Sequence, residues 1–285
     1  MVKELKELWS YRELLYVMVQ RELRIRYKNS ALGLIWSFLN PLFQVLVMTF
    51  AFKVFLNVGG PSHTVYMLSA YLPFMFFQTC VLDSSQSILL QLPLIKKIYF
   101  PREILPLACV FANLIHLLIG FIIFFAILLF VYFLYPGVVP FQATTIFLPI
   151  LIVISFMLAT GASFIVSAFN TFYEDVKYIV TVIMNLMFYL CPIMYYAEHV
   201  ANSQLNKDTH WLLYKLYNLN PLAALSHGYR KVLLAHIPVK INGEMADPMP
   251  TPWKYIAVSG VFAFCLMVFG YWVFNRLKWK FVERP

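Results

Sequence analysis

The chain has 285 residues, of which 61% are hydrophobic and only 12% are charged, and its mean hydropathy is +0.74. A soluble domain usually carries roughly 25% charged residues, so this composition excludes an ordinary soluble protein and indicates one that crosses a membrane. The formal net charge of +9 comes from basic residues that cluster at the ends of apolar stretches, which favours anionic lipid headgroups over nucleic acid as its partner.

The N-terminal segment, residues 1–30, is charged and has no short apolar core with a cleavage site, so it does not read as a signal peptide. Leu8, Tyr11, Leu15 and Met18 recur at helical spacing with charges between them. This pattern predicts an amphipathic helix that lies on the cytoplasmic membrane surface. The alternative is a charged flank that only sets the topology.

Six apolar stretches are long enough to predict membrane-spanning helices, because a span needs about 20 mostly apolar residues. They cover residues 31–58, 65–92, 104–135, 141–168, 176–196 and 253–275. We therefore expect an all-α membrane protein in which residues 1–285 form a single transmembrane domain, with no sizeable soluble domain. Residues 31–196 hold the first five spans, 253–275 the last, and 276–285 a basic tail.

Orientation follows from Lys and Arg in the short flanks. Basic residues precede the first span, lie between the second and third, and follow the last, whereas the connections 57–64 and 136–140 contain none. This predicts that both termini are cytoplasmic. Two charges inside predicted spans need an account, Lys53 and Asp83, but both lie near a membrane boundary, so neither requires a role in proton transfer.

The compact segment LIKKIYFPREILPL, residues 94–107, interrupts two apolar stretches on the predicted cytoplasmic side. Pro101 and Pro106 disfavour helix at the residues before them, so only one or two helical turns fit. Charged edges surround the apolar trio Ile98, Tyr99 and Phe100, which predicts a protruding knob with an anchor for a partner. The alternative is a positive flank and nothing more.

The one long connection, residues 197–252, should lie on the outside. Its stretch 211–236 is apolar but interrupted at Asn220-Pro221 and at Gly228, which predicts two short helices that dip into the outer leaflet.

Aromatic residues make up 18% of the chain. Rings can pack on the apolar faces of sugars and still release them, which suits a polymer that must slide; the alternative is ordinary packing. The candidate channel residues are Tyr71, Phe74, Phe77, Phe188 and Tyr189.

Several kinds of catalytic motif are missing from the sequence. It contains no GxxxxGK[ST] phosphate loop, no HExxH, no GxSxG and no paired cysteines. We therefore expect no enzymatic activity, no metal and no cofactor in this chain. A membrane-bound transferase is the alternative, although no spacing among its polar residues specifies a reaction.

Four stretches, residues 21–42, 94–107, 169–195 and 217–236, resemble in order and place the polysaccharide-exporter branch of ABC transporter permeases. Those proteins export O-antigen, capsular polysaccharide or wall teichoic acid on lipid carriers. One departure is Glu174-Asp175, where the family often has Arg-Asp, and this puts an arginine role at that turn in doubt. Alternatives are a drug or lipid exporter of the same fold and a channel or secondary transporter not driven by ATP.

The resemblance implies a homodimer in the bacterial inner membrane that carries a lipid-linked glycan between its copies. Each copy would dock on a separate cytoplasmic ATPase subunit, which binds ATP and Mg. The implied coupling residues are Lys96, Lys97, Tyr99, Phe100, Pro101, Arg102 and Glu103. The interface helix would use Arg21, Arg24, Arg26, Tyr27 and Lys28. A second cytoplasmic contact would use Tyr173, Glu174 and Asp175.

Overall fold

The computed structural model describes residues 2–28, 30, 33–55, 63–134, 142–203, 211–234, 239–241, 244–246 and 249–281. Within them, five helical segments are long and apolar enough to cross a membrane, and they correspond to five of the six predicted spans. Their main helices are α3 (Trp36–Phe55), α4 (His63–Leu90), α6 (Ile104–Leu134), α7 (Leu148–Phe172) and α13 (Trp253–Leu277). The prediction of an all-α membrane protein is confirmed.

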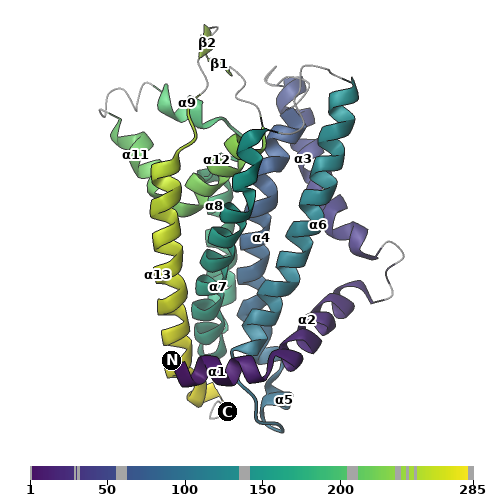
Figure 1. The fold of residues 1–285 in the computed structure, drawn as a ribbon, viewed down its shortest axis with the longest axis vertical. Helices are drawn as coiled ribbons and strands as arrows, with labels where there is room; N and C mark the ends of the chain where they lie inside the picture. Colours follow the sequence, from purple (N-terminus) through teal and green to yellow (C-terminus); the bar gives the residue numbers. More distant parts are fainter. Residues whose placement is uncertain are drawn as a thin grey trace.

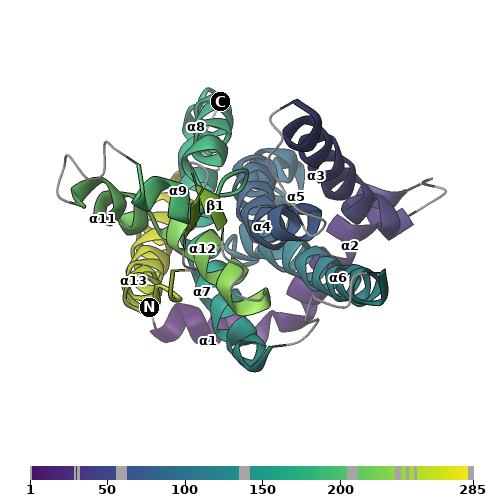
Figure 2. The same ribbon diagram turned by 90° about the horizontal axis from the view of Figure 1, so that it is seen from above.

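The long helices run side by side, with α4 and α7 at the centre of the bundle (Figures 1 and 2). α4 packs on α6 and α7, and α7 packs on α13. The bundle has two ends. At the lower end of Figure 1, here called the termini end, lie α1 (Val2–Ser10) and the last turn η3 (Lys278–Phe281). The opposite end, here called the loop end, holds α9, α11 and the strands.

The fifth predicted span, 176–196, is only partly helical. α8 (Val176–Leu190) has 15 residues, a length of about 22 Å, whereas the hydrocarbon core is about 30 Å thick. The backbone leaves the helix at Cys191 and runs in turns to Tyr196. The prediction of a full-length helical span here is therefore wrong in its C-terminal part.

Short elements cover the loop end (Figure 1). They are η2 (Ala143–Phe147), α9 (Ala197–Ala201), α11 (Leu212–Leu219), α12 (Pro221–Leu233) and a hairpin of β1 (Val239–Ile241) and β2 (Glu244–Ala246). Asn220 caps α12 by accepting a hydrogen bond from the Leu222 amide at 3.1 Å, with Pro221 in the first turn.

The break at Asn220-Pro221 is confirmed, but the predicted break at Gly228 is wrong. α12 continues through Gly228. A Cβ at this position would lie 2.9 Å from Ile256 Cδ1 of α13, so the glycine serves close packing and not a turn. α12 is buried along almost its whole length.

The N-terminal segment forms two helices, α1 and α2 (Arg12–Tyr27). The four residues of the predicted apolar stripe, Leu8, Tyr11, Leu15 and Met18, all pack in one cluster at the termini end with Phe100, Phe274 and Phe281. α1 crosses the bottom of the bundle and α2 packs on α6 (Figure 1). The amphipathic pattern is therefore explained by packing on this protein's own bundle.

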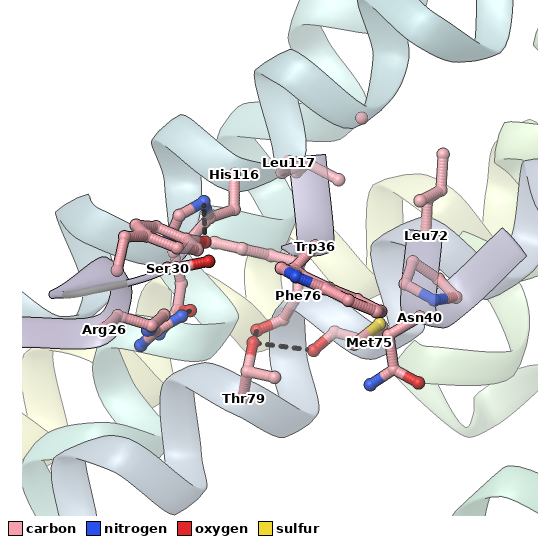
Figure 3. A pocket seen from close by; sticks show the side chains of 14 residues that line it. Arg26, Ser30, Trp36, Asn40, Leu72, Met75, Phe76, Thr79, His116 and Leu117 are labelled. Carbon is pink, nitrogen blue, oxygen red and sulfur yellow. Dashed lines mark hydrogen bonds between the residues drawn. The ribbon is translucent and has the colours of Figure 1, made fainter. Parts of the chain in front are cut away.

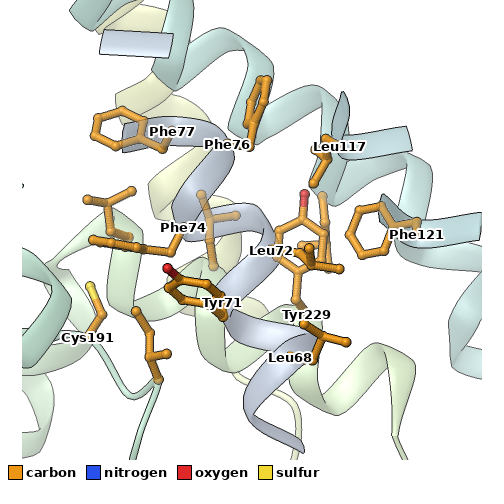
Figure 4. Close-up of a cluster of buried hydrophobic side chains, with 14 of the residues drawn as sticks. Leu68, Tyr71, Leu72, Phe74, Phe76, Phe77, Leu117, Phe121, Cys191 and Tyr229 are labelled. Atoms are coloured by element: carbon orange, nitrogen blue, oxygen red, sulfur yellow. The ribbon is translucent and has the colours of Figure 1, made fainter. Parts of the chain in front are cut away.

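The main core surrounds α4, where Leu68, Phe74 and Phe76 meet Phe121 of α6 and Tyr229 of α12 (Figure 4). α7 and α13 approach each other most closely at Gly161 and Gly270. A Cβ on Gly161 would lie 2.6 Å from the Leu266 backbone, and one on Gly270 would lie 2.4 Å from the Gly161 carbonyl oxygen. Only glycine allows this crossing.

Some predictions fall on other parts of the chain. Residues 57–62 and 136–140 of the connections without Lys or Arg lie outside the described residues, as do residues 204–210 of the long connection and 282–285 of the basic tail.

Candidate functional site

The segment between α4 and α6 forms a short protrusion at the termini end (Figure 1). It starts with α5 (Leu92–Ile95), a single turn with Pro93 near its start, and continues as a turn without helix. The prediction of one or two helical turns is confirmed. At its tip Lys96 and Lys97 are exposed, together with Ile98 (58%) and Tyr99 (69%).

The other residues of the predicted coupling set lie differently. Phe100 is buried in the cluster at the termini end, Pro101 and Glu103 are buried as well, and Arg102 is half-buried. The expectation that Phe100 offers an anchor to a partner is therefore wrong, because its ring is already covered by this chain. We define the exposed tip, Lys96 to Tyr99, as the loop tip.

The base of this protrusion is joined to the end of α13. The Lys278 ammonium donates to Glu103 Oε1 at 2.7 Å, with both side chains almost fully buried. The Arg102 guanidinium donates to the Lys278 carbonyl oxygen and lies 6.0 Å from the centre of the Phe281 ring. These contacts hold the loop tip at a defined place under α13.

A hydrogen bond joins the loop tip to α1. The Tyr99 hydroxyl donates to the Glu7 carboxylate at 3.2 Å. This bond to a carboxylate raises the pKa of Tyr99. The N-terminal helix and the loop tip thus form one surface at the termini end.

The predicted interface helix is α2, and the residues predicted for the interface lie in two settings. Arg24 and Lys28 are exposed, whereas Arg21 and Tyr27 are half-buried. Burial raises the pKa of their neighbour Glu22. These residues continue the basic surface from the loop tip along α2.

Arg26 reaches into the bundle, next to Tyr27, whose hydroxyl lies 3.3 Å from the His116 ring nitrogens of α6. The Arg26 guanidinium donates to Asp83 Oδ2 of α4 at 2.7 Å and to Asn113 Oδ1 of α6 at 2.8 Å. Asn113 in turn donates to the same Asp83 oxygen at 2.8 Å. The charge of Asp83 inside the predicted second span is thus neutralised by an arginine from α2.

The predicted second contact lies in the turn between α7 and α8, where Tyr173, Glu174 and Asp175 are all exposed. Buried Asn170 positions the turn. Its amide donates to the Ser85 carbonyl oxygen at 2.9 Å, and its own oxygen accepts from the Lys177 backbone amide at 2.9 Å.

The candidate channel aromatics lie mostly in the core. Tyr71, Phe74 and Phe77 are at most 7% exposed, so the expectation that they line an open path is wrong for this arrangement of the chain. Phe188 packs edge-on against Tyr71 and near Phe74. Tyr189 alone of the five is largely exposed, at 66%.

Arg230 of α12 binds the backbone that follows the short helix α8. Its guanidinium donates to the carbonyl oxygens of Ile193 at 2.8 Å and Tyr195 at 3.1 Å, and it lies 3.7 Å from the centre of the Tyr66 ring. In a membrane, backbone outside a helix is tolerated only where protein groups satisfy it. Arg230 satisfies the irregular backbone that follows α8.

A buried ion pair follows directly. Lys231 Nζ donates to Glu198 Oε1 of α9 at 2.6 Å, and both side chains are below 10% exposed. Two successive cations, Arg230 and Lys231, therefore fix α12 at the loop end of the bundle.

Two hollows between the helices involve α2. One, about 350 Å³, is lined by α2, α3, α4 and α6. The other, about 590 Å³, is a polar groove between α2, α4 and α8, lined by Glu22, Arg26, Asp83, Gln86 and Lys177 among others. Among the described residues, no three or more His, Cys, Asp or Glu side chains gather as a metal site.

The sequence patterns do not reveal the buried cations that hold the helices together. Arg230 and Lys231 lie in the long connection 197–252, and Lys278 lies in the predicted basic tail. A usable signal was present for Arg230, since it lies within a largely apolar stretch and charges in such places are costly unless paired.

Comparisons with known proteins agree over most of the chain. Residues 13–234 match the family model described as "ABC-2 type transporter". Two Klebsiella pneumoniae proteins named O-antigen export system permease protein RfbA are each 29% identical to the chain over 271 residues, which are 95% of this chain and 94% of theirs. A Myxococcus xanthus protein of the same name is 28% identical over 236 residues, 83% of this chain and 86% of its own.

Proposed function

The chain belongs to the ABC-2 type transporter family, and on this premise we propose that it is the membrane subunit of an ATP-driven exporter of lipid-linked polysaccharide. The transported polymer belongs to the O-antigen class. The whole chain acts as one transmembrane domain, and ATP and Mg are bound by a separate subunit.

The observation that carries this proposal is the extent of the similarity. The Klebsiella relatives, named O-antigen export permeases, align with 95% of this chain and 94% of their own length. A match of this extent includes all five long helices, α12 and the loop tip. It favours polysaccharide over a drug or a simple lipid as the cargo.

The exposed surface at the termini end suits an ATPase partner. The loop tip combines two lysines with two large exposed side chains, Ile98 and Tyr99. Aromatic residues are enriched at the centres of protein interfaces, and lysines at the edge can attract an acidic partner surface. We assign the main ATPase contact to the loop tip and the second to the Tyr173–Asp175 turn.

The termini end faces the cytoplasm of a bacterial cell in this proposal, and the membrane is the inner membrane. Lys96, Lys97, Arg24 and Lys28 are all exposed at this end, in accord with the enrichment of Lys and Arg in short cytoplasmic segments. The polar groove between α2, α4 and α8 then opens toward the compartment in which the polymer is made.

A second copy of the chain completes the transport path. α3 and α8 flank α4 (Figure 2), and each carries large exposed apolar side chains, such as Phe43 and Val47 on α3 and Ile179 and Leu186 on α8. Since three of the candidate aromatics are buried within one chain, a path between two copies would use α8, with Tyr189 as the exposed aromatic residue.

The test is to delete the chain from its host and restore it from a plasmid. If the chain exports lipid-linked polysaccharide, the deletion strain should lose polymer from its surface. The polymer should accumulate on the cytoplasmic side, still attached to lipid. Restoration should require both this chain and an ATPase subunit with intact nucleotide binding. Unchanged surface polymer in the deletion strain would refute the proposal.

A further inference from the structure

The smaller hollow, about 350 Å³, lies within one chain between α2, α3, α4 and α6 (Figure 3). Its volume is in the range of small-molecule sites, about 300–1,000 Å³. None of its described lining residues belongs to α8, and it shares only Arg26 with the lining given for the polar groove.

One side of the pocket is polar. Arg26 and His116 lie there, whereas Leu72 and Met75 lie at the opposite side (Figure 3). The Tyr27 hydroxyl is 3.3 Å from the His116 ring nitrogens. Arg26 is the one residue with a formal charge among the described residues that line the pocket.

Arg26 still has hydrogen atoms to donate. Its two side-chain contacts, to Asp83 and Asn113, use one donor on each terminal nitrogen. A guanidinium has five N–H donors in a planar fork that matches phosphate oxygens. The remaining donors can serve a ligand without breaking the bond to Asp83.

The rest of the lining is largely apolar, with Asn40 and Thr79 as polar exceptions (Figure 3). Leu72, Phe76 and Leu117 contribute hydrocarbon surface, and Gly120 leaves open the space that a side chain would fill. A Cβ at Gly120 would lie 3.3 Å from Leu72 Cδ2. On α4 the lining runs from Leu72 to Thr79, about 10 Å along the helix, which suits a segment of hydrocarbon chain.

The polar side is the one nearer the termini end, because Arg26 bonds to Asp83, one turn beyond Thr79 toward the end of α4 at Leu90. A molecule that fits has an anionic head at Arg26 and an apolar chain directed toward the bilayer centre. A free sugar would place polar groups against the apolar side, and a small free anion would make no contact with it.

We propose that this pocket binds a lipid with a phosphate head, with the phosphate at Arg26 and a hydrocarbon chain against Leu72, Phe76 and Leu117. Two sources share this chemistry: a phospholipid of the surrounding bilayer, and the polyprenyl phosphate end of the exported molecule. The second source rests on the proposed function.

The test is native mass spectrometry of the purified full-length chain with three probes: phosphatidylglycerol, diacylglycerol with the same acyl chains, and undecaprenyl phosphate. A charge-assisted hydrogen bond to phosphate predicts at least a tenfold preference for phosphatidylglycerol over diacylglycerol. Arg26→Gln should remove this preference. Arg24→Gln, an exposed arginine of the same helix, is the matched control and should retain it.

Gly120→Leu keeps the Arg26–Asp83 pair and fills the apolar side of the pocket. It should therefore reduce binding of all three probes, while the melting temperature of the protein stays unchanged. If the Arg26→Gln protein misfolds, the Gly120→Leu protein still tests the pocket. Competition between probes separates the sources. A preference for undecaprenyl phosphate assigns the pocket to the carrier, and a preference for phosphatidylglycerol assigns it to the bilayer.

Equal binding of phosphatidylglycerol by wild type, Arg26→Gln and Gly120→Leu would overturn the inference, as would equal binding of diacylglycerol. The outcome is independent of the export assay. Absent lipid binding with normal polymer export refutes the pocket alone, whereas lipid binding with unchanged surface polymer in the deletion strain refutes only the proposed function.

Discussion

The Lys278 ammonium donates to Glu103 Oε1 at 2.7 Å, across 175 residues of chain. This pair joins the loop between α4 and α6 to η3, the last turn among the described residues, and it is almost completely buried.

Lys278→Met leaves the buried Glu103 carboxylate without its cation. Removal of one partner of a buried pair costs about 3–5 kcal/mol, so thermal unfolding in detergent should shift to clearly lower temperature. The double variant Glu103→Gln/Lys278→Met should recover much of that loss. Lys280→Met, at an exposed neighbour, should unfold like wild type. A Lys278→Met protein as stable as the control would show that the pair contributes nothing.

Ile98→Ala and Phe100→Ala should fail in different ways. Ile98 is 58% exposed at the loop tip, so its truncation should weaken co-purification of the ATPase and lower ATP hydrolysis while the chain keeps its stability. Phe100 is 5% exposed, and its truncation should cost the chain about 3–5 kcal/mol. Ile146→Ala, exposed at the loop end, controls for loss of surface area. Intact ATPase binding by Ile98→Ala would remove the loop tip from the interface.

Arg230→Met should expose Cys191. The thiol is buried beside the backbone that Arg230 holds, at 0% exposure, and each charge-assisted hydrogen bond lost there costs about 1.5–3 kcal/mol. In a Cys265→Ser background, which removes the exposed cysteine, a membrane-impermeant maleimide should label Arg230→Met far faster than wild type. Lys215→Met, at an exposed position of α11, should stay unlabelled. Slow labelling of both variants would show that Arg230 does not hold this segment.

Gly161→Ala should destabilise the crossing of α7 and α13 much more than Gly260→Ala. The new Cβ at Gly161 would lie 2.6 Å from backbone, whereas at Gly260 it would meet only the Ile154 side chain at 3.4 Å. Overpacking of this kind costs about 1–3 kcal/mol. The melting temperatures of the two variants in the same detergent give the comparison. Equal values would mean that the helices separate at no cost.

Hydrophobic periodicity and length were sufficient for the long helices, because a span of about 20 apolar residues has few alternatives in a lipid bilayer. The same reasoning overestimated the span at 176–196, because apolar composition continues past Leu190 while the backbone does not stay helical. Pro192 ends α8, because proline disfavours helix at the residue before it, here Cys191. The irregular backbone beyond is satisfied by Arg230, 37 positions from Ile193, and local sequence does not contain that contact.

The loop tip, too, was predictable only in part. Two prolines and a charged segment predicted a short protrusion correctly, because proline restricts the backbone locally. Which of its side chains point outward could not be predicted. Phe100 and Tyr99 are equally good interface residues by composition, and only the packing of Phe100 against Phe274 and Phe281, far along the chain, separates them.

The length of α8 also has a consequence for biosynthesis. A 15-residue helix is too short to stop in the translocon as an independent span, and the carbonyl groups beyond it stay unsatisfied until Arg230 has been synthesised, 37 residues after Ile193. We therefore expect α8 to become stably inserted in the bilayer only after α12 has been synthesised. A chain truncated between them should leave α8 unstable in the membrane and open to degradation by quality-control proteases.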